Sequence, residues 1–240
     1  MTTRFPLRSA VVLLVVAAVT AVTVGVFADR NPDADAADAA PTIDTRAEAR
    51  AVPAAGASAA SSLPAGSHQV DGLPTGFPHD ELGAVATAVA ATRAQIGFDP
   101  DQAAAVAGVY AAPTERVAFE DLAWNAVGNR REQAGLSPTQ EPPAPTAYAA
   151  TPLAYTFNEV APDQYAVHLL SWITLTSTTA EVKDHLYVGT QLLTWSDDWR
   201  LTMPTVDLRG DLAEQQPPAT TPGTEAFGRA GWVLIEDVNP

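Results

Sequence analysis

The feature that most limits the fold of this chain is an uncharged, apolar run over residues 9–28. Val, Ala and Leu dominate it, and ~20 helical residues span about 30 Å, the thickness of a bilayer's hydrocarbon core. Arg4 and Arg8 precede the run, whereas acidic residues follow it. Because positive charge stays on the cytoplasmic side, residues 1–8 are predicted as a cytoplasmic tail and residues 9–28 as a transmembrane anchor. The remainder is then extracytoplasmic, attached to the cell membrane by a single pass.

A cleaved signal peptide is the alternative interpretation of the same run, because it shares the basic start and the apolar middle. The run is longer than a usual signal core, and Phe27 disrupts the nearest small-residue cleavage site. Small residues at 37–40 offer another site. The sequence favours the uncleaved anchor and leaves cleavage open.

Residues 29–69 contain mainly Ala, Asp, Pro, Ser and Gly. A segment with so few large apolar side chains cannot bury enough surface to offset its ordering entropy. We therefore predict a disordered tether between the anchor and a folded domain at residues 70–208.

Charge and cysteine content exclude several functions. The formal net charge is -15, the pI is near 4.4, and Lys183 is the only lysine. Nucleic acid is an unsuitable ligand for such a chain, since phosphates are bound by clustered Lys and Arg. The absence of cysteine excludes disulfides and thiolate metal sites.

Helical periodicity predicts three helices at the start of the domain. The first follows the turn-rich segment Gly72–Pro78, has acidic capping character at its start in His79–Glu81, and covers Asp80 to about Ile96. Asp99 caps the second, Pro100 occupies its first position, and it ends near Tyr110. The third covers Thr114 to Glu132, with Val117, Leu122 and Ala126 facing inward and Trp124 as a further inward candidate.

After a Pro- and Thr-rich loop at 135–152, the period changes to two. Short connections at 161–164 and 196–198 make neighbouring strands antiparallel. The predicted strands are Leu153–Val160, Tyr165–Ser177, His185–Trp195 and Trp199–Val206. Helices followed by a curved antiparallel sheet give an α+β fold. Residues 209–240 are predicted as a C-terminal extension, with a loop at 211–223 and either a last short strand or a docked apolar tail at 231–238.

Two short motifs resemble a known family. Gly72-Leu73-Pro74-Thr75-Gly76-Phe77-Pro78 followed by Gly83-Ala84-Val85-Ala86, and the later Leu193-Thr194-Trp195 with Asp198-Trp199-Arg200-Leu201, are similar to actinobacterial membrane-anchored proteins of integrative and conjugative elements. The resemblance covers about residues 72–208. It implies an NTF2-like, VirB8-like cone of three helices against a bent sheet, in a non-enzymatic scaffold of a transfer or secretion channel. No catalytic residue transfers.

The residues themselves offer few site candidates. His68 and His79 are expected to be solvated, whereas His168 and His185 lie on predicted strands and could be neighbours across a hairpin. A metal site there would need a third ligand, for which Asp184 or Asp163 is the nearest choice. Satisfied strand histidines are the favoured interpretation, so no metal ligand is assigned.

An acid/base pair inside the cone would be the other route to chemistry. The candidates for it are Asp121, Glu120, Tyr155 and Tyr187. No motif of a known nucleotide, hydrolase or metalloprotease site accompanies them. The sequence therefore predicts no catalytic residue and no cofactor.

Five tryptophans remain, for which core packing is the default role. Binding of a partner would require exposure in an apolar patch. Trp172 and Trp232 are the best candidates for such exposure and for partner contact.

From the sequence we expect a membrane-anchored scaffold of a conjugation-like or envelope machinery that contacts other membrane or channel proteins, with homo-oligomerisation left open. The alternative is an extracytoplasmic module that binds a small molecule or lipid, like proteins associated with lipid-import (Mce) systems. A deep apolar pocket of several hundred Å3 would favour that alternative.

Overall fold

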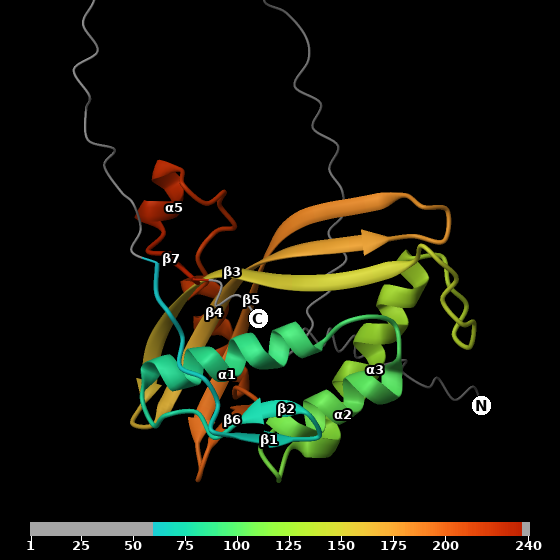
Figure 1. Ribbon diagram of the computed structural model, residues 1–240. Coiled ribbons are helices and arrows are strands. Elements are labelled where there is room, and N and C mark those ends of the chain that lie inside the picture. The colour runs from blue at the N-terminus through green and yellow to red at the C-terminus, as the bar shows by residue number, and fades with distance from the viewer. Residues whose placement is uncertain (1–59, 237–240) are drawn as a thin grey trace, which may run out of the picture.

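The computed structural model describes residues 60–236 as an α+β fold, with three helices on one face of a five-stranded antiparallel sheet (Figure 1). The predicted tail (1–8), anchor (9–28) and most of the tether (29–59) lie outside the described residues. Within those residues, no helix has the length and apolarity needed to cross a bilayer. The elements are β1 (His68–Val70), β2 (Leu73–Thr75), α1 (Glu81–Ala94), α2 (Pro100–Tyr110), α3 (Arg116–Gln133), β3 (Ala147–Ala161), β4 (Gln164–Thr176), β5 (Val182–Trp195), β6 (Trp199–Thr202), α4 (Val206–Gln215), α5 (Glu225–Arg229) and β7 (Val233–Leu234).

The helix starts confirm the predicted caps. The Asp80 carboxylate accepts a hydrogen bond from the Gly83 amide at 2.8 Å at the start of α1. Asp99 accepts from two amides at the start of α2, where Pro100 occupies the first turn. Side-chain oxygens thus satisfy amides that a helix start leaves unpaired.

The main sheet has the strand order β6-β5-β4-β3-β7. The predicted hairpins are confirmed, with Asp163 and Asp197 in the left-handed region at their turns. β3 begins at Ala147, six residues before the predicted start, because its first part pairs with the far end of β4. Pro152 is tolerated there because it lies at a register shift.

The core fills the space between α1 and the sheet. Trp199 of β6 is 1% exposed, and its indole Nε1 donates a hydrogen bond to the Pro78 carbonyl at 2.8 Å. A Cβ at Gly83 would lie 1.9 Å from the same carbonyl oxygen and 3.0 Å from that Nε1 atom. Only a glycine therefore allows the first turn of α1 to lie this close to the sheet.

The inward face of α3 differs from the prediction. Phe119, Ala123 and Val127 are buried, whereas Val117 is 70% exposed and Trp124 is 51% exposed. The expectation that Val117 and Trp124 face inward is therefore wrong. The predicted inward positions Ala126 and Leu122 are confirmed as buried and half-buried.

The C-terminal part packs on the sheet, and the last short strand predicted as one alternative for residues 231–238 is present as β7. α4 buries Leu212 against Ala166 and Leu192, and α5 buries Phe227 beside Leu170. The predicted loop at 211–223 is also wrong at its start, since α4 continues to Gln215. Figure 1 shows α5 on the side of the sheet away from α1–α3.

Residues 60–69 likewise belong to the fold and not to the tether. Ser61 bridges Ile235 in parallel, and the Ser61 amide donates to the Leu234 carbonyl at 2.9 Å. β1 then forms a hairpin with β2. The described fold thus extends beyond both predicted boundaries of 70 and 208, because strand pairing joins its two ends.

Gly83→Ala is expected to destabilise the protein by about 3 kcal/mol, because its Cβ would overlap a backbone oxygen. Gly210→Ala in α4 is the matched control, since a Cβ there meets nothing within 4 Å. It should stabilise by about 0.5–1 kcal/mol. Denaturant unfolding measures both values, and an unaffected Gly83→Ala protein would contradict the contact.

Trp232→Ala is expected to cost about 3–5 kcal/mol of unfolding free energy, because the side chain is 2% exposed on the second face of the sheet. Trp172→Ala, at a position that is 41% exposed, should cost only about 1 kcal/mol. Equal losses in the same unfolding measurement would show that the C-terminal part does not contribute to the fold.

Candidate functional site

A surface groove of 520 Å3 runs along the outer side of α3. Its lining is mainly apolar and comes from α3, from the start of α2 and from the segment that follows α3. The lining residues are Pro100, Trp124, Val127, Gly128, Arg131, Glu132, Gly135, Leu136, Ser137 and Pro138. Trp124 is the large exposed aromatic among them, so it is the principal apolar contact that the groove offers.

Arg131 fixes one wall of the groove. It is buried, and its guanidinium donates to the carbonyls of Phe98, Ser137 and Gln140. Its donors therefore tie the segment after α3 to the segment before α2. Two charged residues line the groove, the cationic Arg131, whose guanidinium is held by these carbonyls, and the acidic Glu132.

Arg130, the preceding residue, does not line the groove. It is 1% exposed, its Nη1 donates to the Gly97 carbonyl at 2.8 Å, and its guanidinium carbon lies 3.7 Å from the centre of the Tyr148 ring. Its Nε and Nη2 atoms have no hydrogen-bond partner among residues 60–236. Burial lowers the pKa of Arg130, with Tyr148 acting in the opposite direction, but a guanidinium remains protonated at neutral pH.

Two tyrosines, Tyr148 of β3 and Tyr187 of β5, lie on the same face of the sheet. Burial raises the pKa of Tyr148, with Arg130 opposing the effect. Burial, and secondly the nearby Tyr148, raises the pKa of Tyr187 to about 12. Both hydroxyls are therefore neutral donors at physiological pH. Two amide oxygens near the C-terminal end of α1, Gln95 Oε1 and Gln191 Oε1, also have no partner among the described residues.

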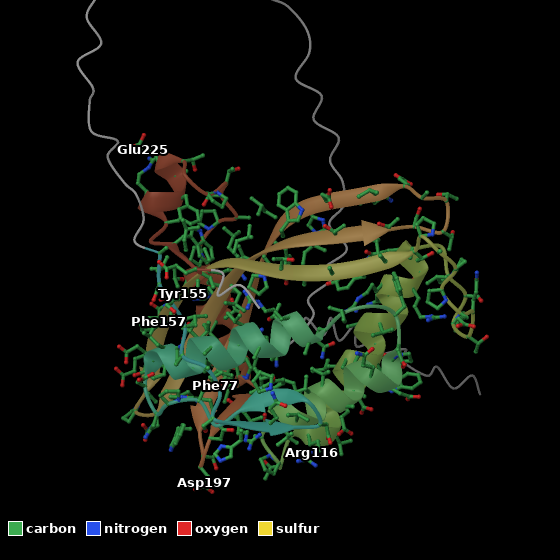
Figure 2. All side chains as sticks on the ribbon, in the orientation of Figure 1. Phe77, Arg116, Tyr155, Phe157, Asp197 and Glu225 are labelled. Atoms are coloured by element: carbon green, nitrogen blue, oxygen red, sulfur yellow. The ribbon has the colours of Figure 1, made fainter. Side chains whose placement is uncertain are left out.

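Of the acid/base candidates, only Tyr187 takes part in this arrangement. Asp121 is exposed on α3 and Glu120 is half-buried beside Gly108. Tyr155 is packed in the core against Phe157, and Figure 2 shows both side chains on β3. The structure does not bring the four residues together.

The strand histidines are not neighbours. In the β4–β5 ladder His168 lies opposite Thr190, whereas His185 lies opposite Ile173. Positions 168 and 173 differ by an odd number, so the two histidines face opposite sides of the sheet. Within residues 60–236 no three His, Cys, Asp or Glu side chains gather in a way that could hold a metal ion.

His79 lies in a cluster at the end of the molecule where Figure 2 places Asp197. Its Nε2 lies 2.7 Å from Asp163 Oδ1, and its ring stacks on Trp195 with centroids 4.0 Å apart. His79 is exposed, as expected, and so is His68, which hydrogen-bonds Ser67. The stacking joins the start of α1 to the β5–β6 hairpin, which is a structural role.

The two tryptophans that are predicted to be exposed differ in burial. Trp172 is partly exposed on β4, whereas Trp232 is buried and donates to the Pro218 carbonyl, so the expected exposure of Trp232 is wrong. Trp124 and Arg130 are not among the site candidates that the sequence pattern indicates. For Arg130 the signal was present, since it follows Phe119, Ala123 and Val127 at helical spacing on the buried stripe.

Comparison of the chain with protein-family models, with curated proteins and with solved structures finds no match.

The buried His168 predicts a specific pH dependence of stability. Its Nδ1 lies 2.8 Å from Thr190 Oγ1, and burial lowers its pKa to about 4. An unfolded histidine has a pKa of about 6.5. Between these values the unfolded chain binds more protons, so the free energy of unfolding falls as the pH is lowered, and it is fully retained above 6.5.

Wild type should therefore lose about 3 kcal/mol more than His168→Gln between pH 7 and pH 4. Denaturant unfolding at several pH values measures the difference. His185→Gln, at an exposed position on the same ladder, is the control and should follow wild type. Parallel profiles for wild type and His168→Gln would refute the neutral buried imidazole.

Proposed function

We propose that this chain is a membrane-anchored, non-enzymatic assembly component of a conjugation-like transfer or envelope machinery, and that it binds protein partners through the α3 groove. The observation that carries the proposal is the exposed Trp124 in a mainly apolar groove of 520 Å3. Large aromatic side chains exposed in apolar hollows are typical of binding surfaces.

The finer fold assignment is part of the proposal. Three helices that precede a long antiparallel sheet and lie on one of its faces are compatible with an NTF2-like, VirB8-like cone. The register shift between Pro152 and Ala154 supports it, because such irregularities bend strands. The C-terminal helices on the second face depart from a bare cone.

Location at the cell membrane, with the N-terminus in the cytoplasm and the domain outside, stays a prediction from residues 1–28. The tether over residues 29–59 would let the domain reach proteins of the envelope. Together with the groove, this favours contacts with other membrane or channel proteins.

The chemistry of the groove favours one kind of partner segment. Trp124, Val127 and Leu136 line the groove with apolar side chains, and Glu132 adds a negative charge beside them. An apolar side chain flanked by Lys or Arg complements both features. We therefore propose a basic, apolar-anchored segment of a membrane protein as the occupant.

The alternative, a carrier of lipid or another apolar ligand, is less well supported. Such a carrier needs an apolar cavity between helices and sheet. Close-packed side chains of the main core, including Val85, Leu169 and Leu193, occupy the space between α1 and the sheet.

Photo-crosslinking in native membranes tests the proposal. A photo-reactive residue at position 124 should give a discrete adduct with a membrane protein that mass spectrometry identifies. The same residue at position 172, which is also partly exposed but lies on the sheet, is the matched control. An adduct with lipid alone, or the same products from both positions, would contradict the proposal.

Binding of the identified partner to the purified full chain gives the second measurement. Trp124→Ala should weaken it about tenfold or more, because a central aromatic is removed. Glu132→Lys should weaken it in a salt-dependent manner, because it removes the complementary charge. Trp172→Ala should leave it unchanged, and an equal loss with that variant would place the interface elsewhere.

A further inference from the structure

We propose that the free edge of the Arg130 guanidinium binds a small carboxylate anion inside the domain, between α3 and the far half of the sheet. Arg130 does not line the groove, so this site is distinct from it and goes beyond the proposed function. The observation behind it is a fully buried guanidinium of which two donors, Nε and Nη2, have no partner in residues 60–236.

The charge of Arg130 calls for an anion. Within the described residues its guanidinium contacts the Gly97 carbonyl and the Tyr148 ring, and no carboxylate there forms an ion pair with it. A buried charge without a counter-charge costs several kcal/mol of stability. An enclosed anion would remove that cost.

The geometry favours a carboxylate among anions. Nε–H and Nη2–H are parallel donors on one edge of the guanidinium plane, which is the edge that binds a carboxylate through two hydrogen bonds. Nη1 is already held by Gly97, and Tyr148 fixes the plane from one side. The Arg130 guanidinium carries one positive charge, so a carboxylate with one negative charge neutralises it better than a phosphate with two.

The surroundings add small side chains and neutral polar groups. Ala150 and Ser171 are small residues on the face of the sheet that carries Tyr148 and Tyr187, as the β3–β4 and β4–β5 registers show. Gly189 lets the Tyr187 ring lie across β5, since a Cβ there would be 3.2 Å from that ring. Neutral tyrosine hydroxyls supply donors to an anion without adding negative charge.

The test measures thermal unfolding of the full chain in detergent, with sodium acetate, propionate and benzoate each compared with sodium chloride at equal ionic strength. At least one carboxylate should raise Tm in a saturable manner, because a ligand that binds only the native state stabilises it. The absence of a saturable rise with all three would overturn the proposal.

Arg130→Lys keeps the charge but lacks the two-donor edge, so carboxylate affinity should fall at least about tenfold. Arg131→Lys is the matched control, because Arg131 is also buried on α3 but its guanidinium is engaged by carbonyls. It should lose stability and keep the affinity. Equal affinities of wild type and Arg130→Lys, within a factor of two, would refute the site.

A measurement on the unmutated protein covers the case in which Arg130→Lys does not fold. In protein labelled with 15N-arginine, the solvent-protected Nε–H signal of a buried arginine should shift as carboxylate is added. The shift should saturate, and its midpoint concentration should equal the concentration that gives half of the rise in Tm. Trp124→Ala should leave that midpoint unchanged, which separates this site from the groove. No shift of any protected Nε–H signal at saturation would contradict carboxylate binding.

Discussion

The fold depends on the close approach of the first turn of α1 to the sheet. Trp199 donates its indole hydrogen to the carbonyl of Pro78, two residues before the Asp80 cap, and Gly83 removes the side chain that would block this approach. His79, stacked on Trp195, extends the same contact to the surface. Aromatic rings fill this end of the domain. The polar site that we propose therefore lies at the other end, where α3 meets the long strands.

Much of the fold could be predicted because its signals are local. The Asp80 and Asp99 caps, the Pro100 helix start and the two hairpin turns depend on neighbours within a few residues, and each is confirmed. The start of β3 was missed because Ala- and Thr-rich residues become a strand only through pairing with β4. The role of the C-terminal part was missed for the same reason, since Trp232 and Phe227 are buried only by the second face of a sheet formed earlier in the chain.

The candidate site shows a similar division. Period alone could place residues on a face of α3, but it could not decide which of two apolar stripes is buried. The stripe with Phe119 and Ala123 packs inward, and that choice leaves Trp124 outside. A polar residue on the buried stripe, Arg130, is visible in the sequence. Its unpaired donors are not, since they depend on which carbonyls the connection between α1 and α2 presents.

That connection joins the groove to the inner site. Consecutive arginines of α3 bind consecutive carbonyls, Arg130 that of Gly97 and Arg131 that of Phe98. The end of α3 favours cations, because the helix dipole is negative there. Neutral carbonyls and the helix dipole offer only partial charges, and Arg131 uses three carbonyls to satisfy its donors. Arg130 has one carbonyl and a ring, so the edge that remains free is the place in the described fold where a full negative charge is most strongly favoured.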